Sequence, residues 1–248
     1  MGLIEEFSKS SHLYDRHAAL QFELGVELVS GLPLDFRPAR VLDLGCGTGR
    51  VSEWMYKKLN PGRFLGVDAS SCMINQAKKR EFGAWRVADF SQDSFWDELG
   101  RFDLIFSNSV LHWIDDLERL FRYVRDHLVV GGCFAFSIFG PKTMQEVSWA
   151  LELDIPASHF LPLKEVMSML ENSGYEVKFK PKLIVSQYNT LLEFLRFVRG
   201  TGIRKERRLL LPSRIRRAER RLQRRFGEIR VSYEVGLFWA WADQKGEA

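Results

Sequence analysis

Three glycines alternate with Cys46 and Thr48 in the segment 45–49, and an acidic residue, Asp43, stands two positions before them. Glycine lets a backbone turn sharply and approach a ligand closely. A loop that binds the pyrophosphate of a dinucleotide has the spacing G-x-G-x-x-G and needs no carboxylate beside the anion. Here the spacing is G-x-G-x-G, and Asp43 favours a cation. The loop therefore suits a ligand with ammonium and sulfonium groups better than it suits NAD.

Two further acidic residues follow the glycine loop at the ends of short apolar runs. Asp68 comes 19 residues after Gly49, and Asp89 is followed by Phe90. A carboxylate can accept two hydroxyl hydrogen bonds, so Asp68 suits a ribose diol. Asp89 offers an acceptor for an adenine amino group beside the apolar surface of Phe90. Together these residues predict a site for an adenosine-containing cation.

The elements that must position these residues alternate between strand and helix. Strands are expected over 41–44, 64–68, 85–89, 102–107 and 133–139. Helices are expected over 5–30, 50–58, 71–80 and 116–128. This alternation predicts an α/β fold with a doubly wound, mostly parallel sheet. Ligands of such sheets bind beyond the carboxyl ends of the strands, where the glycine loop and the acidic residues fall.

The second half of the chain is less regular. Helices are expected over 143–153 and 163–173, and strands over 177–188 and 229–242. The last two strands complete a seven-stranded sheet, with a mostly helical insertion between them. We therefore expect a single domain over 1–248, organised as an N-terminal cap helix (1–35), a cofactor-binding core (36–140) and a basic helical lid insertion (189–228).

The composition is that of an ordinary globular protein, with 46% hydrophobic and 27% charged residues in 248. No stretch is apolar enough to span a membrane, and the N-terminus has acidic residues where a secretory signal needs basic ones. Cys46, Cys72 and Cys133 are too few and too scattered for a disulfide framework or a zinc site. Cys46 reads as a small apolar filler. A cytoplasmic protein without a metal or a membrane partner is expected.

Positive charge gathers in one segment, 199–230, which has 13 Lys or Arg residues against three acidic ones although the whole chain carries only +4. Within it Ala218, Leu222 and Phe226 recur every four residues and predict one apolar helix stripe. The flanking arginines are Arg217, Arg220, Arg221, Arg224 and Arg225. Such a rim is either a solvated helix face or a surface for an anionic partner. Nucleic acid is not expected, because the run lacks interleaved aromatics for base stacking.

The stretch 41–139 resembles the class I S-adenosylmethionine-dependent methyltransferases, whose fold is Rossmann-like. The resemblance rests on DLGCGTGR at 43–50, GVDAS at 66–70, the acid after the third strand and SNSVLHW at 107–113. It implies a cofactor site made of Asp43, Gly45, Cys46, Gly47, Gly49, Asp68, Ala69, Met73, Asp89, Phe90, Asn108 and Gln21. In that site Asp43 and the glycine loop hold the methionine part, Met73 packs on the adenine, and Asn108 lies near the sulfonium.

A narrower resemblance extends over nearly the whole chain, to the malonyl-carrier-protein O-methyltransferases of biotin synthesis. It rests on FSKSSHLY at 7–14, LHW at 111–113, FSIFGPKT at 136–143, GTG at 200–202 and SYEV at 232–235. The resemblance implies methylation of the free carboxylate of a malonyl thioester, on the carrier or on coenzyme A. It also implies an acidic acyl carrier protein as partner, for which the basic segment 199–230 is the complementary surface.

Such a reaction needs no general base, because a carboxylate with a pKa of about 4 is already a nucleophile at neutral pH. It does need a cation or donor for the carboxylate once water is excluded. Arg199 and Arg204 are candidates for this clamp, unless they are solvated surface residues. By resemblance Tyr14 faces the methyl group, and Trp113 could wall the acyl pocket, although both also fit plain packing roles. His112 reads as a structural hydrogen-bonder.

Three other functions remain open at this point. The enzyme could methylate a free small carboxylic acid, it could methylate RNA with the basic run on the phosphates, or the fold could serve a non-methylating assembly protein that binds the cofactor. The segment 107–110 lacks the N-P-P-Y/F tetrapeptide that accompanies methylation of amino groups in bases or glutamine.

Overall fold

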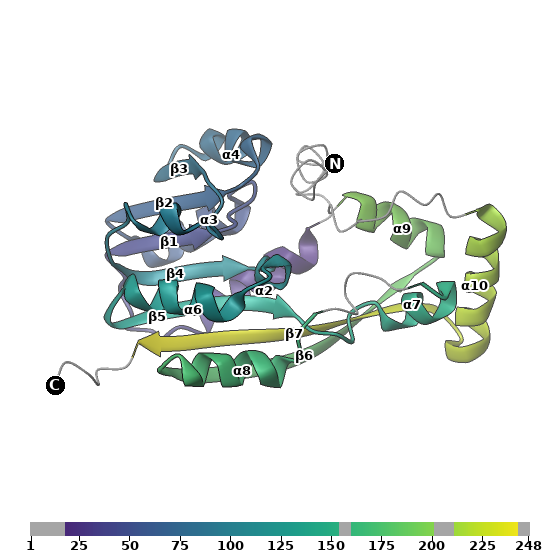
Figure 1. The fold of residues 1–248 in the computed structure, drawn as a ribbon. Coiled ribbons are helices and arrows are strands. Elements are labelled where there is room, and N and C mark those ends of the chain that lie inside the picture. The colour runs from purple at the N-terminus through teal and green to yellow at the C-terminus, as the bar shows by residue number, and fades with distance from the viewer. Residues whose placement is uncertain (1–17, 154–159, 201–210, 243–248) are drawn as a thin grey trace.

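One seven-stranded sheet organises the computed structural model, which describes residues 18–153, 160–200 and 211–242 (Figure 1). The strand order is β3-β2-β1-β4-β5-β7-β6. The strands are β1 (Arg40–Leu44), β2 (Arg63–Asp68), β3 (Ala84–Val87), β4 (Phe102–Asn108), β5 (Leu128–Phe139), β6 (Tyr175–Tyr188) and β7 (Ile229–Ala242). The first five pair in parallel, and β7 runs antiparallel to both of its neighbours. The predicted doubly wound, mostly parallel sheet is confirmed.

Helices cover both faces of this sheet. They are α2 (Ala19–Ser30), α3 (Arg50–Leu59), α4 (Ser71–Ala77), α5 (Asp93–Trp96), α6 (Leu117–Asp126), α7 (Gln145–Leu151), α8 (Leu163–Asn172), α9 (Leu191–Gly200) and α10 (Pro212–Phe226), with short 3-10 turns η1 (Lys78–Arg80) and η2 (Leu111–Trp113). The apolar stripes of α2 and α3 pack on one face, and those of α6 and α8 on the other. Strand β1 is buried from Val41 to Leu44, as a parallel strand covered on both faces must be.

The order in which strands are added to the sheet reverses between β1 and β4, although these two strands are parallel. The chain moves outward from β1 through β2 to β3, and then returns to place β4 on the other side of β1. The loops that follow β1 and β4 therefore diverge to opposite faces and leave a crevice between them, which is where doubly wound folds bind ligands.

Strand β5 begins earlier than its sequence indicates. The glycine pair Gly131-Gly132 suggests the end of a helix, yet the helix α6 stops at Asp126 and β5 starts at Leu128. The pairing jumps from Phe102↔Leu128 to Leu104↔Cys133, so the glycines form an irregularity inside the strand. Gly131 has a φ of +74°, which glycine adopts without strain, and this serves a bulge here, not a turn.

The predicted insertion 189–228 does lie between the last two strands. β6 and β7 pair continuously over fourteen residues, from Tyr175↔Ala242 to Tyr188↔Ile229. Helices α7, α9 and α10 surround the Tyr188 end of this ribbon, away from β1–β3 (Figure 1). We call these three helices, with the strand ends that they cover, the arginine lobe.

The apolar stripe predicted for the basic segment is confirmed in α10. Ala218 and Leu222 are buried in the lobe, and Phe226 packs against its core. Of the helix expected over 5–30, the part that the structure describes runs from Ala19 to Ser30. No helix in the described ranges is both long and apolar enough to cross a membrane.

Candidate active site

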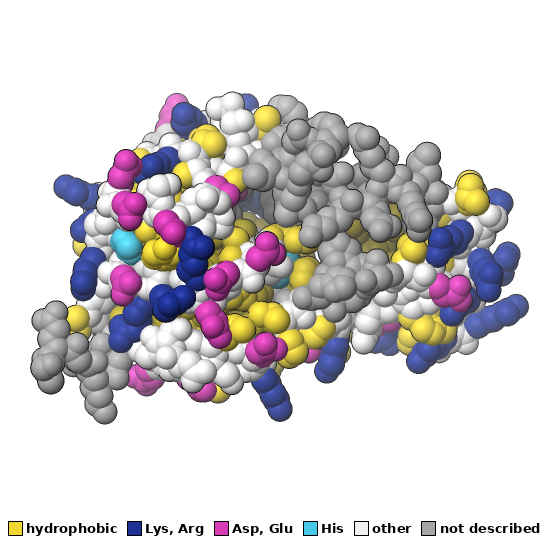
Figure 2. All heavy atoms as spheres, in the orientation of Figure 1, with side chains coloured by type: hydrophobic (Ala, Val, Ile, Leu, Met, Phe, Trp, Pro, Cys, Tyr) yellow, Lys and Arg dark blue, Asp and Glu magenta, His cyan; other side chains and the backbone are white. Residues whose placement is uncertain are grey.

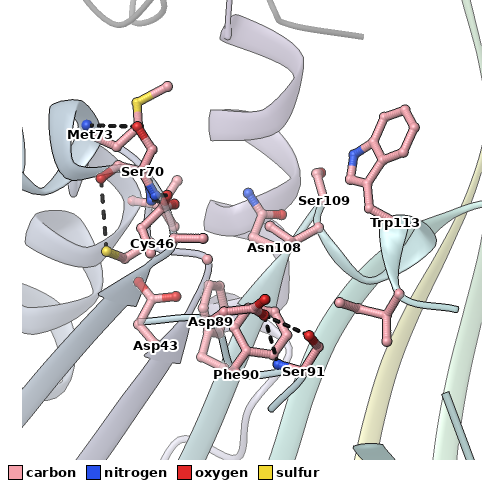
Figure 3. Close-up of a pocket in the computed structure, with 18 of the residues that line it drawn as sticks. Asp43, Cys46, Ser70, Met73, Asp89, Phe90, Ser91, Asn108, Ser109 and Trp113 are labelled. Atoms are coloured by element: carbon pink, nitrogen blue, oxygen red, sulfur yellow. Dashed lines mark hydrogen bonds between the residues drawn. The ribbon is translucent and has the colours of Figure 1, made fainter. Parts of the chain in front are cut away.

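A cavity of about 560 Å³ opens at the carboxyl ends of β1, β2 and β4, beside the point where the strand order reverses. All of the predicted cofactor residues except Gly49 line it, and so does Trp113. In the view of Figure 3, Asn108 at the end of β4 lies between the glycine loop and Trp113. The predicted residues thus line one space.

Gly47 and Gly49 differ in what their backbones do. Gly47 has a φ of +55° and donates its N–H to Asp68 Oδ2 over 2.9 Å, and a side chain built on it would meet nothing within 4 Å. Gly49 has a φ of +75° and caps α3, and a Cβ there would come within 2.8 Å of the Trp85 ring. Gly49 therefore serves the packing of the loop on β3, and the structure does not place it in the cavity wall.

Asp43 is buried in the floor of the cavity, where Ser52 Oγ donates a 2.5 Å hydrogen bond to Oδ2. Burial raises the pKa of this carboxyl to about 7, with the nearby Asp68 adding to the rise and Ser52 opposing it. The same burial, with these two carboxylates, raises the pKa of the Cys46 thiol, which stays neutral. A cationic ligand would offset the cost of keeping Asp43 charged.

Asp68 fastens the end of β2 to two neighbouring loops. Its Oδ2 accepts from Gly47 N at 2.9 Å and its Oδ1 from Ser70 N at 2.8 Å. Burial raises the pKa of Asp68, and the two backbone N–H groups partly counter the rise. Each carboxylate oxygen has a further lone pair, so the geometry leaves acceptor capacity for a diol.

The loop after β3 is also fixed by its acidic residue. Asp89 Oδ1 accepts from both Ser91 N at 3.0 Å and Ser91 Oγ at 2.7 Å. Phe90 is buried, and its carbonyl accepts from Trp96 Nε1 at 2.9 Å. Asp89 is thus exposed at the rim while Phe90 lies in the wall of the cavity, and Met73 of α4 also lines it.

Asn108 ties the helix α2 to the sheet. Its Nδ2 donates to the Gln21 carbonyl at 2.8 Å, and its Oδ1 accepts from Ser137 Oγ at 2.7 Å. The side-chain Oε1 of Gln21 is buried and has no hydrogen-bond partner among the described residues, although Gln21 lines the cavity. A buried acceptor without a donor costs about 1–3 kcal/mol, which a ligand N–H would recover.

His112 and Trp113 stand where the cavity meets the arginine lobe. The imidazole of His112 lies 4.7–5.0 Å from the rings of Trp113, Phe139 and Phe160. The residue is half-buried, but its Nδ1 is out of reach of solvent and has no partner among the described residues, so the expected hydrogen bond is absent there. Burial lowers the pKa of His112 to about 3. The ring therefore packs as an uncharged aromatic.

Several expected residues lie outside the described part of the chain, and others were not expected. Tyr14 and Arg204 are outside it, and of Arg199 only the backbone, in α9, is described. The sequence reasoning missed a group of lining residues on three helices: Phe22, Arg50, Arg119, Leu120 and Tyr123. Positions 119, 120 and 123 share one face of a helix, and this spacing could have grouped them from the sequence. That this face turns to the cavity is decided by packing, which the spacing does not show.

The charge and polarity of the wall fit S-adenosylmethionine. A buried carboxylate, an unpartnered amide oxygen, a diol acceptor and an apolar slot lie around one space. Within the described ranges, no group of three or more His, Cys, Asp or Glu side chains could hold a metal ion. No described residue of α9 or α10 lines the cavity, so no contact in the described structure supports the expected role of the insertion as a lid.

Known proteins resemble this chain in sequence and in fold. A methyltransferase domain model matches residues 14–178. The malonyl-[acyl-carrier protein] O-methyltransferase of Legionella pneumophila is 31% identical over 209 residues, which is 80% of this chain and 72% of that protein. The protein of the same name from Hamiltonella defensa is 30% identical over 241 residues, covering 94% of this chain and 92% of that one.

The similarity of the fold extends further than that of the sequence. The YcgJ protein of Bacillus subtilis superposes with a TM-score of 0.63 at 17% identity, over 90% of this chain and 98% of that one. Phosphoethanolamine N-methyltransferase 2 of Haemonchus contortus, solved in complex with S-adenosyl-L-methionine, gives 0.61 at 16% identity, over 96% of this chain and 57% of that one. The chain therefore belongs to the class I S-adenosylmethionine-dependent methyltransferases, within the family of the malonyl-[acyl-carrier protein] O-methyltransferases.

Proposed function

We propose that this enzyme transfers a methyl group from S-adenosylmethionine to the free carboxylate of a malonyl thioester carried by an acyl carrier protein, in an early step of biotin synthesis. The observation that carries the proposal is an exposed arginine face on the same molecule as the cofactor cavity. The similarity to relatives of that name supports it, because one of them aligns with 94% of this chain and so includes most of the arginine lobe.

Six of the seven arginines of α10 fall into two sets, and the seventh, Arg217, is exposed. One set holds the helix in place. Arg214 donates to the Leu151 carbonyl at 2.8 Å, and Arg221 forms an ion pair with Glu152. The guanidinium carbons of Arg221 and Arg225 lie 4.6 and 4.5 Å from the centre of the Trp149 ring. Arg221 and Arg225, which the sequence placed on a binding rim, are therefore engaged with α7.

The other set points away from the protein. Arg216, Arg220 and Arg224 are exposed and recur every four residues, so they share one face of α10. Figure 2 shows dark blue side chains gathered at the end of the molecule where α10 lies. An acyl carrier protein is small and acidic, and such a row of cations would speed its encounter and orient it.

The reaction is an in-line displacement at carbon. The bound cofactor supplies an electrophilic methyl group on a sulfonium. A carboxylate oxygen of the malonyl group forms a bond to the methyl carbon, the carbon–sulfur bond breaks, and its electron pair stays on sulfur. No proton moves, so the enzyme needs no base. Asp43 stabilises the positive charge before transfer, and the walls align the groups and exclude water.

Four residues are proposed to contact the malonyl substrate and the methyl group. Trp113 walls the cavity on the side of the lobe and would contact the acyl group. Arg199 and Arg204 remain the proposed clamp for the malonyl carboxylate, since a guanidinium can bind both oxygens at once. Tyr14 remains the proposed neighbour of the methyl group.

A methyl-transfer assay with malonyl-carrier protein, malonyl-CoA and free malonate, side by side, tests the proposal. A mass gain of one CH2 on the carrier-bound malonyl group, with a higher kcat/KM than for the other two, is the expected result. Equal or better turnover of free malonate would replace the proposal with a small-acid methyltransferase. Absence of methyl transfer by a protein that binds the cofactor would point to an assembly role.

The docking surface is tested by the triple variant R216E/R220E/R224E. We expect KM for malonyl-carrier protein to rise about tenfold or more at low salt, with malonyl-CoA unaffected. The matched control is K58E/K78E/R101E, which reverses three exposed cations of the core and should leave both substrates unchanged. An equal loss in the two triple variants, or on both substrates, would contradict docking on α10.

A further inference from the structure

A tryptophan, Trp149 of α7, lies at the surface of the arginine lobe. All seven tryptophans of the chain fall within the described residues, and Trp149 is the most exposed of them, at 36%. A single exposed apolar side chain is ordinary on a protein surface. Its surroundings therefore decide what this ring can do.

Two arginines of α10, one helical turn apart, hold the ring of Trp149 in place. The guanidinium carbons of Arg221 and Arg225 lie 4.6 and 4.5 Å from the centre of this ring. The ring of Phe226 approaches it edge to face, with 6.1 Å between the centres. Arg221 also forms an ion pair with Glu152, which directly follows α7. Because Trp149 is restrained in this way, it loses little conformational entropy when a partner covers it.

The surface around Trp149 is strongly positive. Helix α10 has seven arginines in 15 residues and one acidic residue, Glu219, which accepts from Leu191 N of α9 at 2.7 Å. The single negative charge of α10 is therefore engaged with α9. The exposed arginines of the row beside the Trp149 contact are Arg216, Arg220 and Arg224. In Figure 2, hydrophobic side chains lie among dark blue ones at the end of the molecule where α7 and α10 meet.

An exposed aromatic ring among cations could serve nucleic acid or an acidic protein, and the contacts of Trp149 favour the protein. A nucleobase needs an open ring face on which to stack. The space over the Trp149 ring already holds the guanidinium groups of Arg221 and Arg225, so a base would have to displace one of them. The part left exposed is an apolar ring among positive charges. Tryptophan and arginine are the residues that most often dominate the binding energy between two proteins.

We propose that Trp149 is the apolar anchor on which the acyl carrier protein docks, and that the row Arg216, Arg220 and Arg224 steers the carrier to it. The anchor slows dissociation, because its desolvated contact must break before the proteins separate. The outward charges instead speed association. This inference rests on the carrier of the proposed function, and it moves the centre of the docking surface from α10 to the seam between α7 and α10.

Binding of a carrier protein that lacks its prosthetic group separates docking from events in the cavity. By surface plasmon resonance, Trp149→Ala should raise Kd for this apo-carrier about tenfold or more, mainly through faster dissociation. The increase should be similar at about 0.05 M and about 0.3 M salt, because the lost contact is apolar. The increase caused by R216E/R220E/R224E should shrink at the higher salt. Trp149→Phe, which keeps an aromatic ring, should recover part of the affinity.

Leu34→Ala is the matched control, since it removes an exposed apolar side chain from the core, and it should change Kd by less than about twofold. Melting curves establish that each variant is folded. An unchanged Kd in Trp149→Ala, or a loss that disappears at the higher salt, would overturn the anchor and leave the carrier of the proposed function in place. A loss of affinity for a single-stranded RNA oligonucleotide, with the apo-carrier unaffected, would overturn it in favour of nucleic acid. Failure of the wild-type protein to methylate malonyl-carrier protein would remove the proposed function as well.

Discussion

The cofactor cavity and the arginine lobe use charge in opposite ways. In the cavity, Asp43 and Asp68 are turned inward, and both have raised pKa values because burial disfavours their charged forms. In the lobe, the row Arg216, Arg220 and Arg224 is turned outward into water. A small cation would offset the desolvation cost of the buried carboxylates in the cavity, whereas the hydrated charges of the lobe act over a longer range, as the proposed docking of a carrier protein would require.

The interiors of the two regions differ less than their charges do. The lobe has its own apolar contacts around Leu222 and Phe194, and these continue into the core on one face of the sheet. A hydrogen bond of 2.7 Å from Leu191 N to Glu219 Oε1 joins the start of α9 to α10. The lobe is therefore a packed extension of the domain. We therefore expect mutations in its interior to lower the stability of the protein without changing cofactor binding in the cavity.

The largest expected effect is on that packing. Leu222→Ala should lower the free energy of unfolding by about 2–5 kcal/mol, because it leaves a cavity where α10 meets the lobe. Urea denaturation measures the change. Leu192→Ala, at an exposed position of α9, is the control and should change stability by less than about 0.5 kcal/mol. A loss of cofactor affinity in folded Leu222→Ala would show that the two regions are not independent.

A pH dependence of cofactor binding is the next largest effect and belongs to the cavity alone. The free carboxyl of Asp43 has a pKa of about 7, and a bound cation favours its ionised form. A proton must therefore leave on binding below that pH, so affinity for S-adenosylmethionine should fall as pH falls from 7, by up to about tenfold per unit. Calorimetric titrations between about pH 5.5 and 7 measure this change in affinity.

The control for this prediction is Asp43→Asn, which cannot titrate. Its affinity should be lower at neutral pH and nearly constant across the acidic range. If the wild type and Asp43→Asn showed the same slope, another group would be responsible for the proton.

The smallest expected effect lies at the junction of the two regions. The buried Nδ1 of His112 has no partner among the described residues, and His112→Phe replaces this imidazole with an apolar ring of similar size. The free energy of unfolding should therefore stay equal or rise by about 1–3 kcal/mol. The pKa of about 3 in the folded protein lies below the usual histidine value of 6.5, so the wild type loses stability as pH falls below 6.5 and the variant does not. The advantage of the variant should therefore grow on acidification.

Thermal melts near neutral pH and in mild acid measure this difference. His127 provides the comparison, because its Nδ1 and Nε2 lie 2.7 and 3.0 Å from the carbonyls of Tyr123 and Trp96. His127→Phe should destabilise the protein. A wild type more stable than His112→Phe at both pH values would show that the imidazole makes a stabilising contact after all.

Much of the cofactor half could be predicted from the sequence, because its signals are local. The glycine loop, Asp68 and Asp89 each follow a short apolar strand, and parallel strands bring their carboxyl ends to one edge. The surroundings of Gly49, by contrast, depend on packing. Gly49 looks like part of a ligand loop, but the Trp85 ring explains its lack of a side chain.

The lobe was harder to predict, because its arginines have similar local sequences and different surroundings. Arg220 and Arg221 are neighbours, yet one is exposed and the other is bound to Glu152 and Trp149. Their roles depend on where α7 lies, and α7 is more than sixty residues away in the chain. Arg50 was missed for the same reason: its partner Phe22 belongs to a helix that precedes the sheet.

The ribbon of β6 and β7 has a mechanical consequence. Fourteen paired residues, at ~3.3 Å each, make a two-stranded ribbon about 45 Å long that runs from the core of the domain to α9 and α10. Because this pairing is continuous, a carrier protein docked on α10 as proposed would be held at a fixed distance from the methyl donor. The flexible arm of the carrier would then have to span that distance.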